Sequence, residues 1–87
     1  MNTYKPAVKE FLKNYTSSIR VKLNLTQQQM AELLRITPRA YQYLESGTNG
    51  FSASSLILLL SLLSDEDRRM FFRDFQKVLR EAESKNA

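Results

Sequence analysis

The stretch LTQQQMAELLRITPRAYQYLESG, residues 25 to 47, contains two short helical patterns with only three residues between them. Thr26 is a suitable N-cap for the first helix, predicted over about residues 26 to 34, because its hydroxyl can accept a hydrogen bond from the first turn. Thr37 can cap the second helix in the same way. Pro38 then suits the first helical position, where no backbone N–H donor is needed. We therefore expect two consecutive helices joined by a tight turn.

The second of these helices, predicted over residues 37 to 46, has one apolar face and one polar face. At about 100° per residue, the apolar side chains gather on one side: Ala40, Tyr41 and Leu44. The opposite side carries hydrogen-bonding groups: Arg39, Gln42, Tyr43 and Ser46. Gly47 follows as a predicted C-cap. A helix that is held by a short turn with its polar face outward has the geometry of a helix that lies in the major groove of DNA.

Three further helical patterns surround this pair. Pro6 opens the first, whose apolar stripe runs to Leu23 and ends at Asn24, a residue that tolerates a left-handed C-cap. Residues 52 to 63 form the next helix and are apolar almost all round. Ser64 caps the last helix, whose apolar stripe comprises Phe71, Phe72, Phe75, Val78, Leu79 and Ala82. The final five residues, ESKNA, are expected to fray.

These patterns predict an all-α fold of five helices in a single domain over residues 1 to 87. The helix-turn-helix core is expected at about residues 14 to 63, and a C-terminal helix at about residues 65 to 84. The excess positive charge is confined to residues 1 to 64, which carry seven basic and three acidic side chains, whereas residues 65 to 87 carry six of each. An anionic partner would therefore be attracted to the part that holds the paired helices.

Composition argues against several classes of function. The chain has no Cys and no His, so we expect no disulfide, no metal site, no cofactor and no catalytic residue, and we do not expect an enzyme. The longest apolar run, residues 56 to 63, is far shorter than the roughly 18 residues of a membrane span. The N-terminus lacks the apolar core of a signal sequence. A cytoplasmic protein without a membrane anchor is predicted.

Residues 20 to 63 resemble the helix-turn-helix of the lambda-repressor and Cro type. The pattern of that family begins with Leu-Thr-Gln, continues with Ala-Glu, and closes with Glu-x-Gly before a Leu-rich helix. The matching residues here are Leu25, Thr26, Gln27, Ala31, Glu32, Glu45, Gly47, Leu56, Leu59 and Leu63. The resemblance implies a sequence-specific, repressor-like regulator of transcription that binds double-stranded DNA and places the helix of residues 37 to 46 in the major groove.

The same resemblance implies roles for individual side chains. Those expected to read bases are Pro38, Arg39, Gln42 and Tyr43. Those expected to contact phosphates are Gln27, Gln28, Arg35, Ser46, Thr48 and Asn49. Arg20 and Glu45 are expected to form an ion pair between the first helix and the end of the recognition helix. Arg35 takes a turn position at which the family usually has Gly, so either it adopts a left-handed conformation or the turn differs locally.

The assembly is predicted from the two apolar C-terminal helices. A chain this short has little left to cover both of them, so a homodimer on a palindromic operator is expected. Its interface is predicted at Leu58, Phe72, Phe75 and Leu79. One alternative comes from a different class: a protein-interaction module, such as an antitoxin or adaptor, that uses the same scaffold and docks through its last helix. The pattern does not distinguish a phage repressor from a restriction-modification controller.

Overall fold

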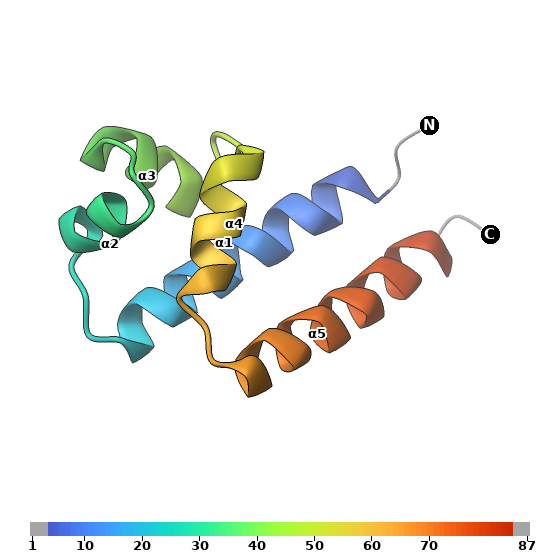
Figure 1. Cartoon of the computed structure of the whole chain (residues 1–87). Helices are drawn as coiled ribbons and strands as arrows, with labels where there is room; N and C mark the ends of the chain where they lie inside the picture. The colour runs from blue at the N-terminus through green and yellow to red at the C-terminus, as the bar shows by residue number, and fades with distance from the viewer. Residues whose placement is uncertain (1–3, 85–87) are drawn as a thin grey trace.

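The computed structural model describes residues 4–84 and contains five helices in that range. They are α1 (Lys5–Lys22), α2 (Gln27–Leu33), α3 (Pro38–Glu45), α4 (Ala53–Ser61) and α5 (Asp65–Ser84). No strand occurs among these residues, and the prediction of an all-α fold of five helices is confirmed. α2 and α3 lie together on one side of the molecule, and α5 runs alongside α1 on the other (Figure 1). The end of the predicted frayed tail, residues 85–87, lies outside the described residues.

Hydroxyl side chains cap the start of four helices. The Thr26 hydroxyl accepts a hydrogen bond from the backbone N–H of Gln29 at 3.1 Å, and the Gln29 side chain accepts one from the backbone N–H of Thr26 at 2.9 Å. Thr37 caps α3 at 3.1 Å, Ser52 caps α4 at 3.2 Å and Ser64 caps α5 at 3.1 Å. Each such cap contributes about 1 kcal/mol. The helix starts predicted from Thr26, Thr37 and Ser64 are confirmed.

Three turn residues adopt the left-handed backbone conformation: Asn24 with φ 59°, Arg35 with φ 60° and Gly47 with φ 81°. The left-handed caps predicted at Asn24 and Gly47 are confirmed. Arg35 keeps the turn geometry that Gly usually provides, at a cost of about 1 to 2 kcal/mol. Its guanidinium offsets part of this cost, because it donates a hydrogen bond to the carbonyl of Leu33 at 2.9 Å, at the C-terminal end of α2.

The core lies where α1 and α4 meet the pair formed by α2 and α3. Its buried members are Ile19, Met30, Ala31, Leu34, Tyr41 and Leu59. Ala31 is fully buried on α2, and α2 packs closely against α3. A larger side chain at this position would push the two helices apart, because a packed core has no room for added methylene groups. The small residue therefore helps to fix the angle of α3.

α5 packs along α1 through a cluster of four aromatic rings. The ring centre of Phe71 lies 5.4 Å from that of Phe11 and 4.9 Å from that of Tyr15, and Phe75 lies 5.9 Å from Phe11. Phe71 is buried and Phe75 is half-buried, whereas Phe72 remains 50% exposed. The sequence predicted that little of the chain would be left to cover the apolar stripe of α5. This is wrong for the side of the stripe that carries Phe71 and Phe75, because α1 covers it.

α4 is held at its C-terminal end by Arg68 of α5. The Arg68 guanidinium donates hydrogen bonds to the carbonyl of Leu60 at 3.0 Å and to that of Leu63 at 2.7 Å. A cation at this end also suits the negative end of the helix dipole. Leu59 is fully buried, but Ile57 on the same helix is 66% exposed. One side of α4 thus remains apolar and open to solvent.

Candidate nucleic-acid interface

α3 lies at an edge of the structure, away from α5 (Figure 1). The four side chains predicted to read bases are all exposed there: Pro38, Arg39, Gln42 and Tyr43. Among residues 4–84, no hydrogen bond or ion pair holds the side chain of Arg39 or of Gln42. The predicted base-reading residues therefore share one open face of a single helix, and two of them have unused donors for a ligand.

The opposite face of α3 anchors the helix in the core. Tyr41 is fully buried and Leu44 is 6% exposed, and Ala40 is half-buried beside them. The apolar face predicted from the helical period is thus confirmed. Any rotation of α3 would expose the Tyr41 ring, so core packing sets the direction in which the polar face points.

Five of the six side chains predicted to contact phosphates are exposed around α3: Gln28, Arg35, Ser46, Thr48 and Asn49. The first belongs to α2, the second to the turn before α3, and the last three to the end of α3 and the turn that follows. Gln27, the sixth, is half-buried. Arg35 thus lies just before the start of α3 and Ser46, Thr48 and Asn49 lie at its end, whereas Gln28 is on the first turn of α2.

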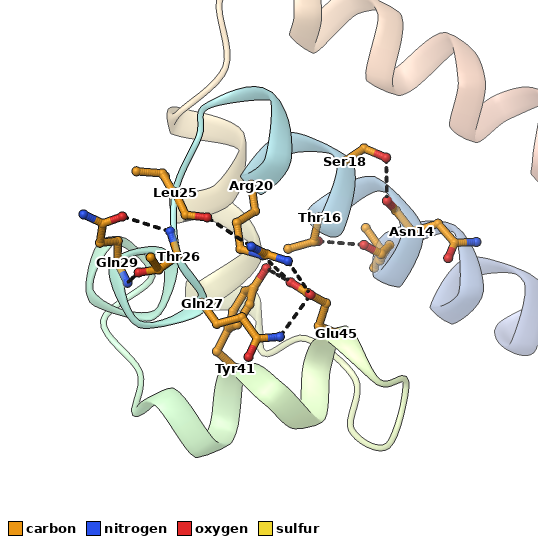
Figure 2. A network of polar contacts seen from close by, with 11 residues as sticks. Asn14, Thr16, Ser18, Arg20, Leu25, Thr26, Gln27, Gln29, Tyr41 and Glu45 are labelled. Atoms are coloured by element: carbon orange, nitrogen blue, oxygen red, sulfur yellow. Dashed lines mark hydrogen bonds and ion pairs between the residues drawn. The ribbon is translucent and has the colours of Figure 1, made fainter.

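Several polar groups converge on the pair of Arg20 and Glu45 (Figure 2). Arg20 Nε donates to Glu45 Oε2 at 2.9 Å, and Arg20 Nη2 donates to Glu45 Oε1 at 3.0 Å. Arg20 Nη1 donates to the carbonyl of Leu25 at 3.0 Å. Gln27 Nε2 donates to Glu45 Oε1 at 3.1 Å, and the Tyr41 hydroxyl donates to Glu45 Oε2. This network ties α1 and the start of α2 to the C-terminal end of α3.

Sequence reasoning expected the ion pair but missed three of its partners: the carbonyl of Leu25 and the side chains of Tyr41 and Gln27. Tyr41 lies four residues before Glu45 on one helix, a spacing that brings side chains together, so a local signal for this contact existed. No local pattern predicts the contact of Gln27, because it joins two different helices. Only one N–H of the Gln27 amide is used in this contact. Its second N–H and its carbonyl oxygen remain available to a ligand.

The network favours the charged forms of the ion pair. Burial alone would raise the pKa of Glu45, but the hydrogen bonds from Arg20, Tyr41 and Gln27 outweigh it and hold that pKa below its ordinary value. The hydrogen bond with Glu45 raises the pKa of Arg20. Burial, together with the hydrogen bond to Glu45, raises the pKa of Tyr41. The phenol therefore stays protonated and acts as a donor to the carboxylate.

The exposed face of α3 offers hydrogen-bond donors and the positive charge of Arg39. Within residues 4–84, no three side chains of His, Cys, Asp or Glu come together as a metal site would require. In the same range, no helix combines the length and the apolar character that crossing a membrane needs. The chemistry of the site is that of hydrogen bonding and charge recognition along α3.

A family model described as helix-turn-helix, of the Cro/C1 type, matches residues 17–64, more than half of the chain. The chain belongs to the Cro/C1-type helix-turn-helix family. Searches of curated proteins and of solved structures gave no match. Membership of the Cro/C1-type family confirms the resemblance seen in the sequence and supports a DNA-binding helix-turn-helix regulator.

The residues that match the Cro/C1-type family include both α2 and α3. The matched segment also contains Arg20, Leu25, Gln27, Tyr41 and Glu45, so the contacts around the ion pair lie wholly within it. Residues 5–16 of α1 and all of α5 lie outside it.

Proposed function

We propose that this protein is a sequence-specific, repressor-like regulator of transcription that places α3 in the major groove of double-stranded DNA. The observation that carries the proposal is the open face of α3, on which Arg39 and Gln42 are exposed and have no partner among residues 4–84. The planar fork of Arg39 suits the two acceptors of guanine, and the amide of Gln42 suits the donor and acceptor of adenine.

The proposed phosphate contacts flank this face. Arg35 precedes α3, and Ser46, Thr48 and Asn49 follow its last turn, while Gln28 lies on the first turn of α2. Donors at both ends of a recognition helix would bind phosphates of the DNA backbone on the two sides of the groove. These contacts would fix the register of the base contacts. Gln27 joins them through its free amide N–H, while its other N–H remains bound to Glu45.

A salt titration of duplex binding tests this function. A protein that neutralises phosphates releases counterions, so its affinity should fall steeply as the salt concentration rises. An antitoxin-like or adaptor-like module that docks on another protein should show little duplex binding at physiological salt. If the protein binds neither random nor selected duplexes in a salt-sensitive way, the proposed function is contradicted.

We further propose that the regulator acts as a homodimer through α4 and α5. Phe72 on α5 is 50% exposed and Ile57 on α4 is 66% exposed. Leu58, Phe75 and Leu79 are half-buried on the same two helices. Burying these apolar groups against a second copy would remove them from water. A two-fold dimer would then present two recognition helices about 34 Å apart, one turn of a palindromic operator.

The homodimer predicts that Phe72→Asp converts the protein to a folded monomer. The side chain is half exposed, so the charge would be tolerated in a monomer but would be desolvated in an interface. Sedimentation at tens of micromolar measures the change. Met70→Asp is the matched control, because Met70 is also an apolar residue of α5, 46% exposed, but lies about 160° around the helix from Phe72. Phe75→Asp should also prevent association but should cost more stability, because Phe75 contacts Phe11. A clean monomer for the unaltered protein would contradict the proposal.

A further inference from the structure

Three lysines form a regular row along the first half of α1. Lys5, Lys9 and Lys13 are spaced four residues apart, so they lie on one side of the helix at intervals of about 6 Å. Arg20 lies within about 60° of the same stripe, and its guanidinium reaches Glu45 at the end of α3. This side of α1 therefore faces the C-terminal end of the recognition helix.

The row continues the surface that follows α3. Lys9 Nζ lies 3.4 Å from the backbone carbonyl of Thr48. Lys13 crosses Gly47 so closely that a Cβ placed there would lie 3.1 Å from the Lys13 Cδ atom. Both lysines thus lie directly beside the turn whose Thr48 and Asn49 are proposed phosphate contacts. The lysine row and the turn after α3 are therefore adjacent.

The three lysines line an apolar hollow of about 500 Å³ between α1 and the turn. Its apolar lining includes Val8, Leu12, Leu44 and Phe51. Long charged side chains commonly bury their methylene stems in this way while the ammonium groups reach water. The ammonium groups of these lysines are therefore the part of the row that can face a charged partner.

Little negative charge opposes this row. Glu10 is the one acidic residue of α1, and its carboxylate lies 3.9 Å from Lys13 Nζ with 66% of its side chain exposed. Lys5 and Lys9 are exposed and pair with no carboxylate among residues 4–84. At least two full positive charges are therefore available beside the turn.

We propose that Lys5, Lys9 and Lys13 bind the phosphate backbone of the same duplex that α3 reads. The inference rests on the proposed function and extends its contact surface beyond residues 17–64, which match the family. An evenly spaced row of charges matches a linear polyanion such as a DNA strand better than a compact small anion. Each ammonium group that neutralises a phosphate releases a counterion, so the contribution is independent of base sequence and sensitive to salt.

The test compares two triple variants with equal loss of charge. Lys5→Gln, Lys9→Gln and Lys13→Gln remove the three positive charges and leave shorter, polar side chains. Arg69→Gln, Arg73→Gln and Lys77→Gln are the matched control, because these exposed residues have the same spacing on α5. Affinity for one duplex is measured over a range of salt concentrations, and thermal unfolding checks that each variant is folded.

The lysine variant should lose about 2 to 3 units from the slope of log affinity against log salt, at about 0.9 per phosphate contact. Its affinity for selected and random duplexes should fall by the same factor, and the α5 control should keep most of the slope. Lys9→Gln alone should lose about one unit, which provides a second reading if the triple variant folds poorly.

Two results would overturn the inference while the proposed function stands. One is an equal change of slope in both triple variants, given a steep slope for the unaltered protein. The other is a loss of affinity for the selected duplex alone, because a phosphate contact cannot distinguish sequences. If the unaltered protein shows no salt-sensitive binding, the proposed function and this inference both fail.

Discussion

Arg20→Ala should lower the free energy of unfolding by about 2 kcal/mol or more, whereas an exposed ion pair is worth about 0 to 1 kcal/mol. Only 20% of the Arg20 side chain and 13% of the Glu45 side chain are exposed. Removing the guanidinium leaves a largely buried carboxylate without its cation and takes a donor from the carbonyl of Leu25. Chemical denaturation of both proteins measures the loss.

A double-mutant cycle separates the pair from the rest of the network. Arg20→Ala and Glu45→Ala should show a coupling energy above about 1 kcal/mol, because the two groups share two hydrogen bonds. The pair of Lys22 and Asp67 is the matched control, since its atoms lie 3.3 Å apart but its side chains are 71% and 34% exposed. Its coupling should stay below about 1 kcal/mol. A coupling energy of zero between Arg20 and Glu45 would contradict this prediction and show that the two behave as ordinary surface charges.

The contribution of Glu45 should be present at neutral pH and lost in acid. Its pKa is lower in the folded protein than the ordinary value of 4.5, which applies when the chain is unfolded. The stability it provides is therefore complete above that value and disappears as the pH falls through the folded pKa. Between about pH 7 and about pH 3, the free energy of unfolding should therefore fall less for Glu45→Gln than for the unaltered protein. Parallel profiles for the two proteins would contradict this assignment.

Arg39→Ala should weaken binding to the specific duplex by about 1 to 3 kcal/mol per half-site and relax the base preference at one position. The Arg39 guanidinium has no partner among residues 4–84, so its removal should leave thermal stability unchanged. Affinities for a selected and a random duplex, measured at one salt concentration, give the comparison. An equal loss of affinity for both duplexes would show that Arg39 contacts a phosphate and not a base.

A phosphate contact provides the control for Arg39. Gln27→Ala is expected to weaken all duplexes evenly, but Gln27 also donates to Glu45, so this change should disturb the network as well. Gln28→Ala is the cleaner control, because Gln28 is exposed at the start of α2. It should lower affinity for selected and random duplexes by the same factor.

Local chemistry explains why much of the fold could be predicted from the sequence. Thr26 and Thr37 mark helix starts because a hydroxyl satisfies an N–H of the first turn, whatever lies around it. Asn24 and Gly47 mark left-handed turns for an equally local reason. The faces of α3 followed from the period of its apolar residues, and Tyr41 is buried as that period required.

The remaining features depend on which surfaces meet. The stripe on α5 was visible in the sequence, but a helical period does not identify the partner of a face. The contacts of Phe71 with Phe11 and Tyr15 therefore appear only in the structure. The position of Lys9 beside Thr48 likewise depends on how α1 packs against the turn after α3. The hydrogen bond from Gln27 to Glu45 likewise depends on how α2 packs against α3.

Selection of bound duplexes from a random pool tests the central claim that α3 reads a DNA sequence. For the unaltered protein we expect enrichment of one short half-site in two inverted copies, with centres about 34 Å apart. For Arg39→Ala we expect the same spacing with one position of each half-site relaxed. A pool that remains random after selection by the folded, unaltered protein would contradict sequence-specific recognition by α3.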